Sequence, residues 1–216
     1  MKLKKLLKYI TPPIILIFYN WFKNLLISDS KNIFEGDFEL FSDLIKNCIV
    51  YGEYGCGKTT LWVAKNSDCK ILSVDSSLKW INLVEKKLNV FVNPNRFELL
   101  HSYCGEISDF GYPKDYSERN AYYEYFNSIW ERDLSPDLVL IDGRFRVACF
   151  LTSLLRSKPG TKILFDDYSL REEYHIIEDF ITPKIKTKRQ ALFIKPKNID
   201  EKKIIYEINK FNYVKE

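Results

Sequence analysis

The chain has 216 residues, of which 46% are hydrophobic and 29% charged, and its net charge is +4. This length suits one well-filled α/β domain, and the composition excludes a disordered chain. Nucleic-acid binders usually concentrate basic residues on one face. The mild charge here gives no such indication, so we expect no nucleic-acid partner.

Cysteine and histidine usage argues against a metal centre built from these residues. Five cysteines occur without any CxxC pair, and there are only two histidines. An odd number of cysteines without metal-ligand spacing favours a reduced, intracellular protein. We therefore expect no structural zinc and no protein-bound metal, and we predict a cytoplasmic location. The cysteines are Cys48, Cys56, Cys69, Cys104 and Cys149.

Residues 1–30 form a distinct basic and apolar segment, predicted to be helical. Its apolar run Ile14–Phe18 is far shorter than the roughly 20 residues that span a bilayer. No small-x-small site marks a signal peptide. Two interpretations stay open. The segment packs on the domain as a helix, or residues 1–24 lie on an anionic membrane surface, which would place the protein at the inner face of a membrane.

Residues 31–216 alternate between predicted strands and helices in a single domain. A short helix is expected within 35–47, and helices are also expected over 59–66, 76–88, 145–157 and 171–181. Apolar runs of buried-strand type occur at 47–53, 69–75, 96–103, 136–143 and 161–168. Residues 189–211 are predicted as two strands joined by a charged loop, and 184–189 as a solvated loop. The alternation predicts a mostly parallel sheet with helices on both faces and an antiparallel edge.

The stretch GEYGCGKT, residues 52–59, satisfies two different loop patterns. As a nucleotide P-loop, it would place Lys58 on the phosphates and Thr59 on magnesium. The carboxylate of Asp142 would serve the same magnesium ion. It also contains an acidic-x-Gly-x-Gly turn, typical of proteins that bind S-adenosylmethionine (SAM). In that case Glu53 would end the strand and two glycines would allow a tight turn.

The spacing after this loop favours the SAM interpretation. Asp75 ends the second predicted strand and stands 20 residues after Gly55. An acid at that position accepts hydrogen bonds from ribose hydroxyls, whereas a P-loop has no need of it. The predicted helix after the loop is also short, since it breaks at Asn66.

Five blocks of the sequence resemble the class I SAM-dependent methyltransferase-like family. They are VYGEYGCGKTTLWVA, ILSVDSSLKWINLVEKKL, LLHSYCGEISDFGYPKDY, PDLVLIDGRFRVACFLTSLL and ILFDDYSLREEYHIIEDF. The resemblance runs from Cys48 to Phe193, and IDGRFRVAC is its most specific part. Members tend to carry small residues where Lys58 and Thr59 stand. The resemblance implies a Rossmann-like α/β sandwich, with a mostly parallel sheet and an antiparallel edge strand, and SAM as cofactor.

The resemblance and the positions at strand ends together select the candidate cofactor-binding residues. Acids at the ends of the first two strands are expected to orient SAM, and the glycine loop to contact it through its backbone. The residue pair that ends the third strand is expected near the adenine. This set comprises Glu53, Gly55, Cys56, Gly57, Asp75, Ser76, His101 and Ser102.

Acceptor and proton chemistry is expected beyond the fourth and fifth strands. Asp142, Asp167 and His175 are the catalytic candidates, with His175 alternatively a polar surface residue. Arg144, Arg146 and Tyr112 are the candidates for substrate binding, the two arginines holding an anionic or hydroxyl-rich acceptor, although one arginine alternatively forms an ion pair inside the fold. A divalent cation at Asp166 and Asp167 is the less favoured alternative.

The connection Ser102–Asp133 is long and rich in aromatic residues. Such insertions often form lids, and aromatic faces suit sugar rings. The alternative is that Tyr122, Tyr125, Phe126 and Ile129 are the core-facing stripe of a helix. The N-terminal segment also looks like openings common among enzymes of cell-surface polysaccharide pathways. We therefore expect O-methylation of a sugar hydroxyl on a small-molecule or glycan acceptor. The alternatives are a P-loop ATPase or kinase, and a non-catalytic binding module.

Overall fold

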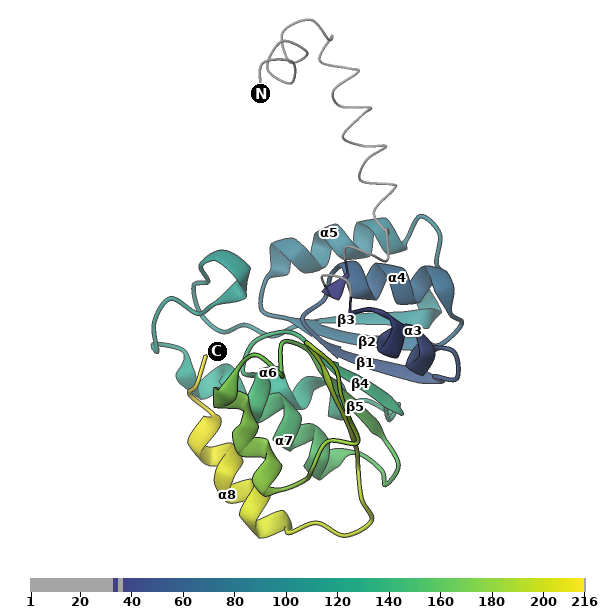
Figure 1. Cartoon of the computed structure of the whole chain (residues 1–216). Coiled ribbons are helices and arrows are strands. Elements are labelled where there is room, and N and C mark those ends of the chain that lie inside the picture. The colour runs from purple at the N-terminus through teal and green to yellow at the C-terminus, as the bar shows by residue number, and fades with distance from the viewer. Residues whose placement is uncertain (1–32, 35–36, 216) are drawn as a thin grey trace, which may run out of the picture.

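The structure is a computed structural model that describes residues 33–34 and 37–215 (Figure 1). The predictions made for residues 1–30 lie outside the described residues. Among those described, none of the helices combines the length and the apolar character that crossing a bilayer requires.

A seven-stranded sheet forms the centre of the described chain, in the order β3-β2-β1-β4-β5-β7-β6. Strands β1 to β5 run parallel to their neighbours, β7 runs antiparallel to β5, and β6 antiparallel to β7. The mostly parallel sheet with an antiparallel edge is therefore confirmed. The strands are β1 (Val50–Tyr54), β2 (Lys70–Asp75), β3 (Phe97–His101), β4 (Leu138–Ile141), β5 (Lys162–Phe165), β6 (Ile185–Lys186) and β7 (Ala191–Ile194).

Helices cover both faces of this sheet (Figure 1). One face carries α3 (Glu39–Ile45), α4 (Lys58–Asn66) and α5 (Leu78–Leu88), and the other α6 (Tyr122–Asn127), α7 (Arg146–Arg156) and α8 (Glu201–Phe211). Each face has its own cluster of buried apolar side chains. Because both faces are covered, every residue of β1 and β4 is buried, which explains why these strands appear as continuous apolar runs.

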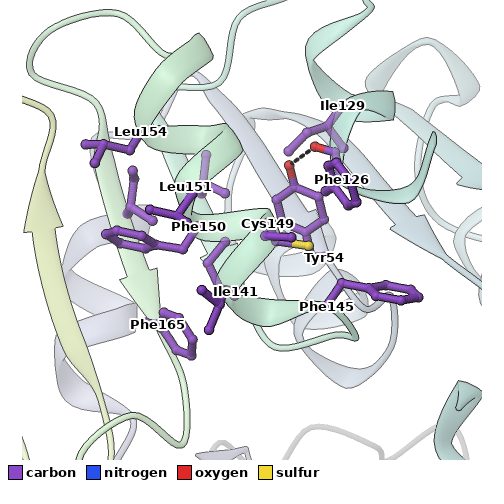
Figure 2. Packing of buried hydrophobic residues seen from close by; sticks show 14 of the residues in the cluster. Tyr54, Phe126, Ile129, Ile141, Phe145, Cys149, Phe150, Leu151, Leu154 and Phe165 are labelled. Atoms are coloured by element: carbon purple, nitrogen blue, oxygen red, sulfur yellow. Dashed lines mark hydrogen bonds between the residues drawn. The ribbon is translucent and has the colours of Figure 1, made fainter. Parts of the chain in front are cut away.

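The core beneath α7 fixes the end of β1 (Figure 2). The hydroxyl of Tyr54, the last residue of β1, donates to the carbonyl oxygen of Phe126 at 2.7 Å. The same hydroxyl accepts a hydrogen bond from Nε1 of Trp130 at 2.9 Å. Phe150 and Leu154 of α7 lie in the same cluster. This packing anchors the point at which the chain leaves β1 for the glycine loop.

The C-terminal part departs from the sequence-based expectation. The second of the two strands predicted in 189–211 is wrong, since Glu201–Phe211 forms helix α8. The buried side chain of Ile204 packs in the cluster beneath α7, and Ile208 and Phe211 lie on the same side of the helix. Asp200 caps the start of α8, where its side chain accepts a hydrogen bond from the backbone N–H of Lys203 at 3.0 Å. The edge strand β6 lies instead in the stretch predicted as a solvated loop. Glu172–Asp179, predicted as an α-helix, is a 3₁₀ segment.

The insertion between β3 and β4 divides into two parts. Its second part contains α6, and the four residues of the predicted stripe, Tyr122, Tyr125, Phe126 and Ile129, are all buried. For these four residues the core-packing alternative is therefore correct. The first part carries Tyr103 and Phe110, which are exposed.

Candidate functional site

A cavity of about 1220 Å³ opens at the carboxyl ends of the central parallel strands. It is lined by residues that follow β1, β2 and β4 and by the first part of the β3–β4 insertion. The strand order reverses at β1, because β2 lies on one side of it and β4 on the other. In open α/β sheets this switch point is where ligands bind.

The glycine loop, residues 55–57 between β1 and α4, lines the cavity and requires glycine at Gly55. That residue has a φ of 93°, in the left-handed region, and an added Cβ would lie 2.8 Å from the Cα of Gly143. The loop then enters α4, where the backbone N–H of Gly57 donates to Oγ1 of Thr60 at 2.7 Å. Cys56 accepts a hydrogen bond from the indole N–H of Trp80 through its carbonyl oxygen.

Glu53 is fully buried behind the loop and does not line the cavity. Its carboxylate accepts hydrogen bonds from four hydroxyls, those of Tyr51, Thr59, Thr60 and Ser73. Burial raises the pKa of Glu53 to about 7, and the hydroxyl donors oppose this rise. The geometry gives Glu53 contacts with β1, β2 and α4 that hold the loop from behind. The hydroxyl of Thr59, the magnesium ligand of the P-loop alternative, is hydrogen bonded to this carboxylate.

Asp75, at the end of β2, does line the cavity. Its Oδ1 accepts the backbone N–H of Ser77 at 2.8 Å, and burial raises the pKa of Asp75 to about 6. The hydroxyl of Ser76 donates to the carbonyl of Gly111 at 2.9 Å, which ties the β3–β4 insertion to the end of β2. Both Ser76 and His101 line the cavity, whereas Ser102 is buried and does not.

Three carboxylates gather where β4 and β5 end. Oxygens of Asp142, Asp166 and Asp167 lie within 4.8 Å of one another. Oxygen ligands at this spacing would fit a divalent cation, but each of the three carboxylates is paired with an arginine. Burial raises the pKa of Asp142 to about 8; nearby Asp166 adds to the rise and Arg146 opposes it. That the site binds no metal stays a prediction, and a divalent cation at Asp166 and Asp167 stays its less favoured alternative.

Arg146, a substrate-binding candidate, is committed inside the fold. Its side chain is 4% exposed, and it pairs with Asp142 at 3.2 Å and Asp167 at 3.4 Å. It also donates to the carbonyl oxygens of Gly143 at 3.1 Å and Asp166 at 2.8 Å. For Arg146 the alternative of an ion pair inside the fold is therefore correct. The pair also holds the Asp142 side chain at the cavity.

Arg144 has a different environment from Arg146 and lines the cavity. Its guanidinium carbon lies 4.0 Å from the centre of the Tyr112 ring. Its backbone N–H donates to the hydroxyl of Tyr125 at 3.2 Å. The structure thus brings together two of the predicted acceptor-binding residues, Arg144 and Tyr112, although Tyr112 itself does not line the cavity. It adds Tyr125, which does.

His175 and Asp167 do not line the cavity. Nε2 of His175 lies 3.2 Å from the carbonyl oxygen of Tyr168, and its ring packs on the Tyr168 ring with centroids 4.8 Å apart. Asp167 pairs with Arg146, Arg171 and Arg189. Their catalytic roles remain predictions.

Arg189 and Trp80 line the cavity and were not among the sequence-based candidates. Arg189 reaches it because β7 returns antiparallel beside β5, and its guanidinium lies 2.7 Å from carboxylate oxygens of both Asp166 and Asp167. No local motif marks this arginine. Trp80 could have been suspected, since a large aromatic residue at the start of a helix follows Asp75 closely.

Replacing Gly143 by alanine is expected to destabilise the fold by about 1–3 kcal/mol, the usual cost of overpacking. The new Cβ would collide with the Tyr125 hydroxyl and lie 2.8 Å from the backbone nitrogen of Gly55. Urea unfolding monitored by circular dichroism measures the loss. The Tyr125→Phe background removes the nearest atom, so it should recover part of the loss. Wild-type stability of Gly143→Ala would contradict the close approach of the two loops.

No protein-family model matches the chain, and no curated protein does. Among solved structures, a methyltransferase-like protein from Silicibacter pomeroyi DSS-3 matches with a TM-score of 0.74 and 26% identity, over 82% of this chain and 93% of that one. A methyltransferase from Geobacter sulfurreducens matches with a TM-score of 0.50 and 12% identity, over 90% of this chain and 97% of that one. These matches give no support to the P-loop alternative. The protein has the class I SAM-dependent methyltransferase fold.

Proposed function

We propose that the protein is a SAM-dependent methyltransferase that methylates a sugar hydroxyl in glycan biosynthesis. One observation carries the proposal: the glycine loop, Asp75 and Asp142 converge on a single cavity at the switch point of the sheet. The sugar acceptor is supported by the family resemblance and by the exposed, hydroxyl-bearing aromatic ring of Tyr103 in the cavity wall. Fold alone does not determine the acceptor.

The cavity has the features that SAM requires. Gly55 permits the loop to pass close to the backbone of Gly143, which a Cβ would block, and Gly55, Cys56 and Gly57 all line the cavity. The carboxylate of Asp75 would accept hydrogen bonds from the ribose hydroxyls. His101 and Ser76 would lie beside it. Glu53 would act from behind, by holding the loop through Thr59 and Thr60.

Asp142 is the residue best placed to take the acceptor proton. It lines the cavity at the end of β4, and Arg146 holds its Oδ1 at 3.2 Å. Its raised pKa suits a base that works near neutral pH. When bound, SAM supplies a methyl carbon on a sulfonium, whose sulfur keeps the electron pair as the acceptor oxygen bonds to carbon. The protein's contribution is to align that oxygen and remove its proton.

A thermal-shift titration with S-adenosylhomocysteine (SAH) and with ATP–magnesium tests this proposal. A ligand at 100 times its dissociation constant adds about 2.7 kcal/mol. For this chain length that should raise the midpoint by roughly 5–10 °C, at about 2–4 °C per kcal/mol. We expect a shift with SAH that Asp75→Ala abolishes and Lys58→Ala largely retains. Asp68→Ala is the control, because Asp68 is fully exposed and lies outside the cavity.

Other outcomes would favour the alternatives. A shift with ATP alone, lost in Lys58→Ala, would replace the methyltransferase by a P-loop enzyme. No shift with either ligand would favour a binding module that has lost the cofactor. The cytoplasmic location remains a prediction that this experiment does not address.

A further inference from the structure

The charged side chains that line the cavity are not balanced. Asp142 pairs with Arg146, Arg189 with Asp166 and Asp167, and Glu106 with Lys114. In the part of the chain that the structure describes, the cavity-lining cations Lys58, Lys79 and Arg144 form no ion pair. Among the cavity acids, Asp75 is the one that forms no ion pair in the same part of the chain, and the positive charge of Arg144 acts on it through space, so one acid stands against three cations. The uncompensated charge facing the cavity is therefore positive.

Among these three cations, Arg144 is the one whose side chain and backbone are both held by contacts with tyrosines. Its guanidinium group lies over the Tyr112 ring, and its backbone is held by the Tyr125 hydroxyl. Yet within the described residues no acceptor takes a hydrogen bond from that group, and its Nη1 is sealed from solvent without a partner. A buried donor left unpaired is costly and uncommon. Arg146, two residues later, has its donors engaged by carboxylates and carbonyls instead.

The chemistry of an unpaired guanidinium indicates what it would bind. Its planar fork of N–H donors matches a carboxylate or phosphate in a two-point hydrogen bond. The ring of Tyr112 holds the guanidinium carbon 4.0 Å from its centre, which restricts where those donors lie. A neutral hydroxyl-rich ligand would leave the positive charge without a counter-ion in a partly desolvated cavity.

SAM does not remove the excess positive charge. Its one carboxylate would pair with one of the three cations, but its ammonium and sulfonium add two positive charges, so its net charge is positive. The balancing negative charge would then arrive with the second ligand. We propose that the acceptor is an acidic sugar, whose carboxylate or phosphate group is bound by Arg144 over Tyr112. This inference rests on the proposed methyltransferase function, and it selects the anionic of the two acceptor classes that Arg144 would accommodate.

Isothermal titration calorimetry of the full-length protein, with and without saturating SAH, tests the proposal. The probes are glucuronate and galacturonate for the carboxylate, a glucose phosphate for the phosphate, and glucose and galactose as neutral counterparts. We expect at least one acidic probe to bind about tenfold or more tightly than its neutral counterpart, as for hydrogen bonds to charged groups. Arg144→Gln should abolish this preference, and Arg144→Lys should retain part of it.

Arg132→Gln is the matched control. Arg132 pairs with Glu98 at 2.8 Å and lies outside the cavity, so the preference for acids should survive its loss. The proposal is overturned if no acidic probe binds more tightly than its neutral counterpart, or if Arg144→Gln weakens acidic and neutral probes equally. SAH binding without a preference for acids would overturn this inference alone. A preference for acids in a protein that does not bind SAH would overturn the methyltransferase proposal, and with it the role of the acid as a methyl acceptor, while Arg144 would remain the anion-binding residue.

Discussion

Replacing Asp142 by asparagine is expected to lower kcat by about 10²–10⁴-fold, the usual contribution of a general base. The amide has nearly the shape of the carboxylate and keeps an oxygen for Arg146, which contacts Oδ1 at 3.2 Å, but it cannot accept the proton. SAH affinity should change little, because Asp75 and the glycine loop remain. Single-turnover rates with labelled SAM, measured beside SAH affinity, separate the two effects. A kcat within a few-fold of wild type would exclude Asp142 as the base.

The pH profile gives a second test of the same residue. Asp142 works as a base only when deprotonated, and its pKa is raised to about 8. The wild-type kcat/KM should therefore rise with pH and level off above about 8. In Asp142→Asn the residual rate should lose this rise. A wild-type profile that is flat from about pH 6 to about pH 10, two units on either side of that pKa, would contradict the assignment.

The same pKa shift predicts how stability depends on pH. The unfolded value of an aspartate is about 3.9, well below the folded value of about 8. Between these values the folded protein binds more protons than the unfolded chain, so the contribution of Asp142 to stability falls as pH rises through this window. Asp142→Asn should show a shallower fall over the same range in urea unfolding.

Replacing Arg146 by methionine is expected to destabilise the protein by about 3–5 kcal/mol, the cost of removing one partner from a buried ion pair. The Arg146 side chain is 4% exposed, and its loss would leave Asp142 and Asp167 facing each other. Three backbone carbonyls, those of Asp142, Gly143 and Asp166, would also lose a donor. Equilibrium urea unfolding measures the effect directly.

Arg171→Met is the matched control for that experiment. Arg171 also pairs with Asp167, at 3.1 Å, but its side chain is 39% exposed. Exposed ion pairs contribute about 0–1 kcal/mol, so its loss should be small. If both methionine variants lost the same stability, the buried network around Arg146 would not be the stabilising feature described here.

Prediction from sequence failed where a tertiary contact outweighed the local pattern. The apolar residues of 201–211 support either a strand or a helix, and packing beneath α7 decides for the helix. Glu53 ends an apolar run next to a glycine turn, which resembles a ligand position, yet four hydroxyls from β1, β2 and α4 surround it. Arg144 and Arg146 look equivalent in the sequence. They differ in the fold because Asp166 and Asp167, just after β5, contact Arg146.

The sequence by itself determined the class of fold, and it placed the candidate site at the ends of the strands where the cavity lies. The features that indicated both are local: apolar runs that alternate with helices, the turn at Gly55, and Asp75 20 residues later. Such features can be recognised without knowledge of contacts between residues far apart in the chain. Only the tertiary structure decided which charges face the cavity. The antiparallel return of β7 brings Arg189 to Asp166 and Asp167. The carboxylate of Asp167 and the carbonyl oxygen of Asp166, just after β5, hold Arg146 inside the fold. Whether a charge is paired depends on residues far apart in the chain, and for that physical reason no local pattern predicts it.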